Sequence, residues 1–170
     1  MKLKQREALD AYKRFGGLRK AVFCVCCLCV ASIFFGSDIK AITEDCVRCN
    51  FDNQNLALAD FTNSNLSGSS FRNAYLMGTD FTGAVLDGTD FSDAIANLAI
   101  FKDAHLKDTV FIATQLELSN FEGAHFLGAN FTKAHLVHAS LNVNNAKSAI
   151  FCATILSVEL FGTTVDNRDC

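Results

Sequence analysis

The sequence of 170 residues contains no proline and no tryptophan. Without proline, the chain has no proline-rich linker or polyproline segment. It also lacks common enzyme motifs, since no Gly-rich phosphate loop, P-loop lysine or H-E-x-x-H pattern occurs. The carboxylates are spread along the chain without a recognisable nucleophile and base. We therefore expect a non-catalytic protein with no catalytic residue, no cofactor and no resident metal ion.

What the sequence does contain is a long run of period five. From Phe51 to Phe161 every fifth residue is apolar, and a small residue such as Ala, Ser or Thr stands two positions before most of them. Ala96 and Ala146 are the thin points, because neither fills the space of a leucine. The large side chains predicted to form the core are Phe51, Phe61, Phe71, Phe81, Phe91, Phe101, Phe111, Phe121, Phe131, Phe151 and Phe161, with Leu56, Leu66, Leu76, Leu86, Leu106, Leu116 and Leu136.

A period of five fits neither regular helix nor flat strand. On an α-helix each successive large residue would turn by roughly 140°, so the stripe would wind around the surface. On a strand an odd spacing sends successive large residues to opposite faces. A chain that turns a corner every five residues keeps them all inside. Because Phe and Leu alternate, an even number of sides would place Phe on one pair of opposite walls and Leu on the other.

Several segments carry a resemblance to a known family. Residues 74–78 (AYLMG), 84–88 (AVLDG), 104–108 (AHLKD) and 129–133 (ANFTK) resemble pentapeptide repeats, whose pattern is A-(D/N)-L-x-x with Phe as a common replacement for Leu. The resemblance implies an all-β repeat solenoid, a right-handed quadrilateral β-helix with four pentapeptides per coil. It predicts nearly six coils over residues 51–161, with residues twenty apart stacked about 4.8 Å from each other.

The N-terminal region predicts export or membrane attachment. Residues 1–20 are basic, and residues 21–36 are an uncharged apolar run that would span about 24 Å as a helix. Seven Lys or Arg precede the run and only Lys40 follows closely, which favours a cytoplasmic N-terminus. The run is read as a signal-peptide segment, an uncleaved anchor or a helix that caps the solenoid. We expect the solenoid in the bacterial periplasm or the thylakoid lumen, with the membrane as partner if the run is retained.

Eight cysteines fall in three places: the apolar run, the C-x-x-C before the first repeat, and the C-terminal part with Cys152 and Cys170. Four lie inside the apolar run (Cys24, Cys26, Cys27 and Cys29), where small apolar packing is favoured over acylation or metal binding. Residues 37–50 form a predicted cap and linker that ends in the C-x-x-C of Cys46 and Cys49. That motif before the first repeat is similar to the start of exported pentapeptide-repeat proteins, which implies a disulfide. A redox-active dithiol or half of a zinc site are the alternatives.

Outward positions offer two further candidates. The stretch from Ile95 to Ile100, and the stretches 110–113 and 155–160, are apolar at positions that would face solvent, so they are candidate contact surfaces. His105 and His125 are twenty residues apart and should lie about 5 Å apart on one wall. They are either two metal ligands or a ladder of surface histidines, and the second interpretation is favoured because no third ligand shares the wall.

No amphipathic helix is expected in the tail 162–170, so the sequence predicts no cap for the last coil. Cys170 is a possible partner of Cys152, and the open end predicts a possible homodimer. The function that fits best is a scaffold or protein-binding module with an unknown protein partner and no direct binding of nucleic acid. The alternative, implied by the family, is a DNA mimic that binds gyrase, for which the net charge of −6 over residues 46–170 is low.

Overall fold

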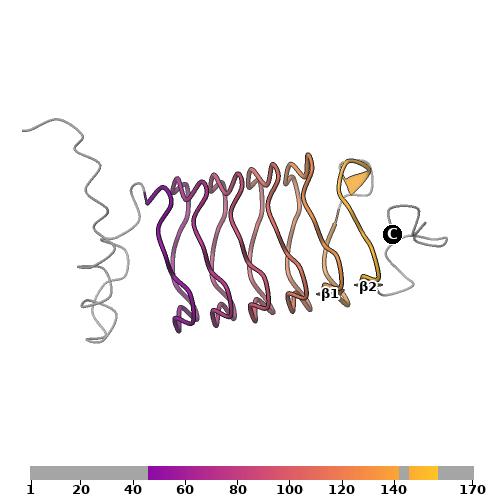
Figure 1. Cartoon of the computed structure of the whole chain (residues 1–170), viewed down its shortest axis with the longest axis horizontal. Helices are drawn as coiled ribbons and strands as arrows, with labels where there is room; N and C mark the ends of the chain where they lie inside the picture. The colour runs from indigo at the N-terminus through magenta and orange to yellow at the C-terminus, as the bar shows by residue number, and fades with distance from the viewer. Residues whose placement is uncertain (1–45, 142–145, 157–170) are drawn as a thin grey trace, which may run out of the picture.

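The computed structural model describes residues 46–141 and 146–156, which form a column of stacked coils (Figure 1). Strand β1 (His135–Leu136) pairs in parallel with β2 (Ile155–Leu156). Below them, parallel bridges join residues twenty apart, from Asn50 and Ser70 up to Asn130 and Ile150. A coil therefore takes twenty residues, as the repeat predicts.

Some of the predicted features lie outside the described residues. These are the basic region 1–20, the apolar run 21–36, residues 37–45 of the cap and the tail 162–170. Phe161 and residues 142–145 are also outside them, so the total of nearly six coils stays a prediction. Within residues 46–141 and 146–156, no helix is long and apolar enough to cross a membrane.

The chain turns a corner after every central apolar residue. At one such corner the amide of Ala59 donates to the carbonyl of Leu56 at 3.0 Å, which closes a four-residue turn. Leu58, the third residue of this turn, has φ of +60°. A positive φ recurs at this position in coil after coil, held by glycine at six corners and by other residues at the rest. A residue with left-handed backbone conformation therefore recurs about every five positions, once at each corner.

Backbone hydrogen bonds between coils use three amides of each pentapeptide. The amide of Phe71 donates to Asp90, that of Asn73 donates to Ser92, and that of Tyr75 donates back to Gln54, at 2.7–3.0 Å. A fourth amide closes the turn. The chain is therefore held to the coils on both sides, and an inserted residue would displace every later bond.

The fifth amide explains why Asn and Asp are frequent before the central residue. The amide of Thr62 donates to Oδ1 of Asp60 at 3.0 Å, and that of Ala57 donates to Oδ1 of Asn55 at 3.2 Å. This is the corner role expected of short polar side chains. Where the wall residue is Ser70 instead, the amide of Arg72 still finds an acceptor, Oδ1 of Asp52 one coil below.

The interior consists of aromatic columns that meet at the axis. Phe71, Phe91 and Phe111 stack with ring centroids 5.0 Å apart and planes within 8° of parallel. The opposite column, which contains Phe81 and Phe101, meets the first edge to face at 5.5–5.8 Å. Offset stacking and edge-to-face contact are both favourable arrangements of aromatic rings.

The predicted core residues take these interior positions where they are described. All of the predicted phenylalanines and leucines from Phe51 to Leu136 are buried, and Phe151 is partly buried. Ala96 and Ala146 are buried as well. Phe126 takes the position that Leu66, Leu86 and Leu106 hold in the three coils before it, and it contacts Phe121 and Phe131.

Where the small residue two positions before the central one is threonine, its hydroxyl group can donate a hydrogen bond to the coil below. The hydroxyl of Thr79 donates to the carbonyl of Leu56 at 2.8 Å, and that of Thr109 donates to Leu86 at the same distance. Each acceptor lies 23 residues earlier, in the coil below. Ser64 has the one buried side-chain oxygen without a partner among the described residues, and the residue 23 positions before it, Ala41, lies outside them.

Replacement of Phe91 by alanine tests the aromatic columns. Phe91 is fully buried and touches rings above, below and across the axis. We expect Phe91→Ala to lower the free energy of unfolding by about 3–5 kcal/mol in urea titration. Leu58→Ala is the matched control, because its side chain is exposed and its removal should change the value by less than about 0.5 kcal/mol. Equal effects of the two variants would contradict the packing described.

Candidate functional site

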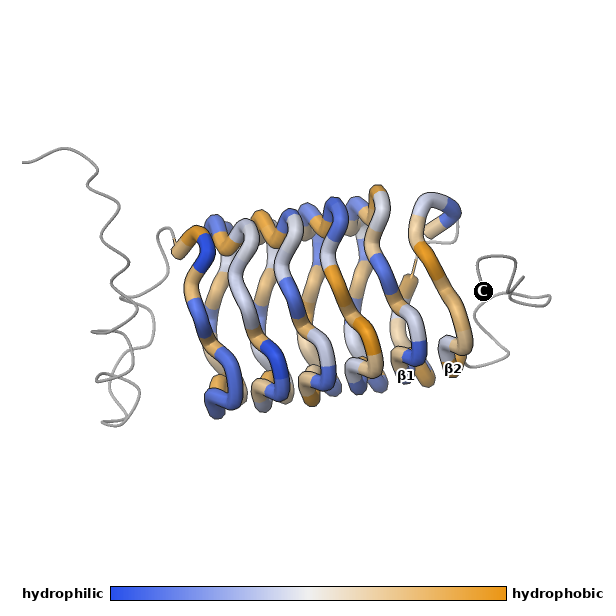
Figure 2. The backbone as a smooth tube through the Cα atoms, in the orientation of Figure 1, coloured by the Kyte–Doolittle hydropathy of each residue, from blue (hydrophilic) through white to orange (hydrophobic). Residues whose placement is uncertain are grey.

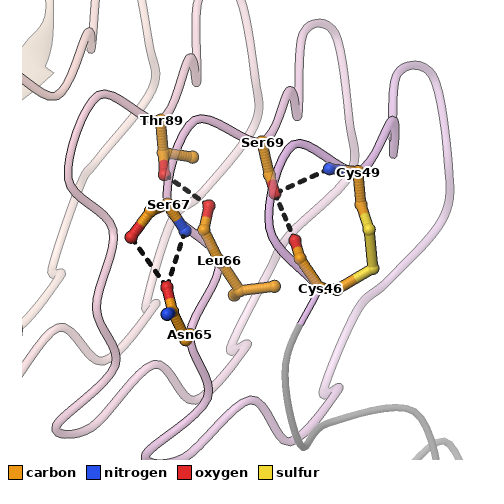
Figure 3. Close-up of a disulfide and its surroundings, with 7 residues drawn as sticks. All are labelled: Cys46, Cys49, Asn65, Leu66, Ser67, Ser69 and Thr89. Carbon is orange, nitrogen blue, oxygen red and sulfur yellow. Dashed lines mark hydrogen bonds between the residues drawn. A yellow bond between two sulfur atoms is a disulfide. The ribbon is translucent and has the colours of Figure 1, made fainter. Parts of the chain in front are cut away.

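The C-x-x-C lies at the first described corner of the solenoid. The sulfur atoms of Cys46 and Cys49 lie at disulfide-bond distance, with the Cα atoms of the two residues 5.5 Å apart (Figure 3). Cys49 is buried, and its amide donates to Oγ of Ser69 at 3.0 Å. The same hydroxyl donates to the carbonyl of Cys46 at 2.7 Å. These two hydrogen bonds attach the cysteine pair to the coil above it.

No second pair of cysteines lies within residues 46–141 and 146–156. Cys170, the expected partner of Cys152, lies outside the described residues. The four cysteines of the apolar run lie outside them too. In residues 46–141 and 146–156 no group of three or more His, Cys, Asp or Glu side chains could hold a metal ion.

One of the four corners of the coil is apolar. It follows the column of Leu56, Leu76, Ala96, Leu116 and Leu136, and its tip residues repeat every twenty positions. Leu58 is 79% exposed, Leu98 50% and Leu118 56%, while Met77 beside Gly78 is 39% exposed. A methyl group of Leu58 covers Gly78, since a Cβ there would lie 2.8 Å from it. We call Leu58, Met77, Leu98 and Leu118 the apolar corner.

The walls beside the apolar corner extend it. Tyr75 and Ile95 lie on the wall before the corner and Ile100 on the wall after it, all partly exposed. The hydroxyl of Tyr75 reaches the sulfur of Met77 at 3.4 Å. Hydrophobic residues, buried and exposed alike, recur as orange segments along the coils in Figure 2. The only charged side chain among the described tip residues of this corner is Glu117.

Sequence reasoning found part of this surface. It named the stretch from Ile95 to Ile100, which contains Leu98, but missed Leu58, Met77 and Leu118. The signal was present, because an apolar residue two positions after the central one recurs at intervals of 20 or 40 residues. The stretch 110–113 lies on a different wall and corner, with its side chains largely covered.

Charged residues in the described part pair locally rather than gather. Arg72 forms an ion pair with Asp90 at 3.1 Å, and Lys102 lies 3.9 Å from Glu122. Ten Asp and Glu against six Lys and Arg give a net charge of −4 for the described residues. No acidic surface comparable to a nucleic acid follows from this distribution.

The histidine pair lies as predicted on one wall. His105 and His125 occupy bridged positions in adjacent coils, with ring centroids 5.2 Å apart. His135 belongs to β1 on another wall, and His138 lies at a corner. The sequence thus located this pair correctly from the twenty-residue coil alone.

Comparison with known proteins agrees with this architecture. The family of pentapeptide repeats (8 copies) matches residues 45–83, and the pentapeptide repeat region family matches residues 77–151. Together they span the described coils almost entirely. No curated protein matches the sequence significantly.

Solved structures of other pentapeptide repeat proteins are similar in fold. Rfr23 from the cyanobacterium Cyanothece 51142 is 17% identical, with a TM-score of 0.57 over 75% of this chain and 95% of that one. AT2G44920 from the Arabidopsis thaliana thylakoid lumen is 25% identical, with a TM-score of 0.54 over 79% and 92%. QnrB1, a plasmid-mediated fluoroquinolone resistance protein, is 18% identical, with a TM-score of 0.38 over 66% of this chain and 67% of that one.

The two family matches agree with the architecture, in which the chain turns a corner every five residues and completes a coil every twenty. The chain belongs to the pentapeptide repeat family.

Proposed function

We propose that the protein is a non-catalytic scaffold that binds a partner protein through the apolar corner. The observation that carries this proposal is the exposure of Leu58, Leu98 and Leu118 at left-handed positions, with φ of +60°, +61° and +58°. The left-handed conformation costs a side-chain-bearing residue about 1–2 kcal/mol. Exposed leucine adds a solubility cost, so neither folding nor solubility explains these residues.

The shape of the apolar corner indicates the chemistry of its partner. Its side chains project from a convex edge, about 4.8 Å apart for each coil along the axis. A convex row of uncharged side chains fits an apolar groove, such as one between two helices of the partner. Buried apolar anchors of this kind supply most of the binding energy at protein interfaces.

The distribution of charge does not favour the alternative of a DNA mimic that binds gyrase. Lys102, Lys107 and Lys133 interrupt the acidic residues, and duplex DNA carries one negative charge for about every 1.7 Å. The apolar corner has no counterpart on a nucleic acid. A protein partner with an apolar groove therefore remains the proposal.

We further propose that the solenoid functions on the far side of a membrane, in a periplasm or a thylakoid lumen. The basic and apolar N-terminal regions support export. The similar fold of a protein from the thylakoid lumen supports it as well. The Cys46–Cys49 bond belongs to this proposal, because such a bond persists in an oxidising compartment.

Site-directed crosslinking tests the partner surface. A photoreactive amino acid placed at Met77 should give one discrete adduct in an extract of the source organism, since Met77 lies within the apolar corner. Leu98→Asn with Leu118→Asn should abolish the adduct and leave unfolding in urea unchanged or more resistant, because asparagine tolerates the left-handed region.

The matched control for crosslinking is the same amino acid at Asp93. Asp93 is an exposed residue at the tip of a neighbouring corner, where it takes the left-handed position that Leu98 takes on the apolar corner, with φ of +60°. It should give no adduct of that size. Equal labelling from both positions, or an adduct that survives the double substitution, would rule out the apolar corner as the binding surface.

Export is tested separately by fusing residues 1–45 to alkaline phosphatase, an enzyme that becomes active only outside the bacterial cytoplasm. The fusion should be active, and deletion of residues 21–36 should abolish the activity. An inactive fusion that accumulates intact in the cytoplasm would overturn the proposed location without affecting the proposed partner surface.

The disulfide gives a stability prediction for the mature protein. Cys46→Ser with Cys49→Ser, measured without reductant, should lower the free energy of unfolding by about 2 kcal/mol through the entropy of a four-residue loop. Mass spectrometry after alkylation should find both cysteines of the wild-type protein unmodified. Alkylation of both thiols in protein isolated without reductant would contradict the bond.

A further inference from the structure

His105 and His125 form an exposed pair on a wall of the solenoid, away from the residues of the apolar corner. The two residues are bridged in parallel, and the amide of His125 donates to the carbonyl of Ala104 at 3.0 Å. Both side chains are exposed, their ring centroids are 5.2 Å apart and their planes are inclined by 50°. The backbone on both sides is fixed by coil-to-coil hydrogen bonds, so the spacing of the pair is set by the fold.

The spacing fits a shared metal ion. Zinc lies about 2.0–2.1 Å from an imidazole nitrogen, so each ring centroid would be about 3.2 Å from the ion. Two such rings at the tetrahedral angle of about 109° have centroids about 5.2 Å apart. The observed centroid distance of 5.2 Å equals this value, so the spacing of the two coils suits a shared ion once each side chain turns one ring nitrogen toward it.

The surroundings of the pair include charges of both signs. Asp103 lies at the corner before His105 and Asp108 at the corner after it, and their carboxylates rest over Gly123 and Gly128 of the next coil. Lys102 and Lys107 occupy the same two corners, but Lys102 is paired with Glu122. Three carboxylates (Asp103, Asp108 and Glu122) against two ammonium groups leave a net charge of −1 around the pair, which favours a cation only slightly.

We propose that His105 and His125 together bind one divalent transition metal ion, with Zn²⁺ as the reference case. Imidazole nitrogen suits zinc, copper and nickel. Two protein ligands leave the remaining positions to water, which agrees with the absence of any group of three metal-binding side chains in the described residues. The site is an exchangeable surface site, and it departs from the sequence-based expectation of a ladder of surface histidines without a metal ion.

Titration of the full-length protein with Zn²⁺ tests this site, after the free thiols have been blocked with iodoacetamide. The ring signals of His105 and His125 should shift together in NMR spectra, with one common midpoint. His105→Gln should weaken binding at His125 at least tenfold, and His125→Gln should do the same to His105, because each substitution removes one of two shared ligands.

His135→Gln is the matched control, since His135 lies on a different wall and should not affect the titration. Independent midpoints for the two rings, or a single substitution that leaves the other histidine's affinity unchanged, would show separate weak binding and overturn the proposal. The absence of any shift of the two ring signals at millimolar Zn²⁺ would overturn it as well.

Discussion

The backbone hydrogen bonds between coils are the interaction on which the rest of the structure depends. The amides of residues such as Phe71 and Tyr75 bind the coils above and below, so the chain must return to the same register after every twenty residues. Side-chain columns, ladder positions and corners all inherit this register. Each coil then stabilises only its neighbours, which is the energetic pattern of a solenoid.

The left-handed residue at each corner is the cost of that register. Glycine meets it without strain at positions such as Gly88, and Asn or Asp meets it at moderate cost. Leu58, Leu98 and Leu118 are poorly suited to it and are also exposed. Leucine is disfavoured both in the left-handed conformation and on an exposed surface. Its recurrence along one edge therefore indicates a role other than folding, and the apolar corner is proposed as the binding surface for this reason.

Much of the architecture followed from the period alone. The burial of Phe91, the proximity of His105 to His125 and the corner role of Asp60 all depend on spacing, and spacing is visible in a sequence. The apolar corner was only partly predicted, because its members are separated by twenty or forty residues and none is unusual alone. Their alignment requires knowing which of two outward positions forms the tip.

The sequence by itself determined the repeat, the interior residues and the number of residues in a coil, because a strict period admits one way of burying Phe and Leu together. The tertiary structure decided which residues share an outer edge and how far their side chains project. It also decided the donors and acceptors, such as the pairing of Thr79 with Leu56. Those contacts join residues about twenty positions apart, and their geometry depends on the angle of each corner rather than on any local pattern.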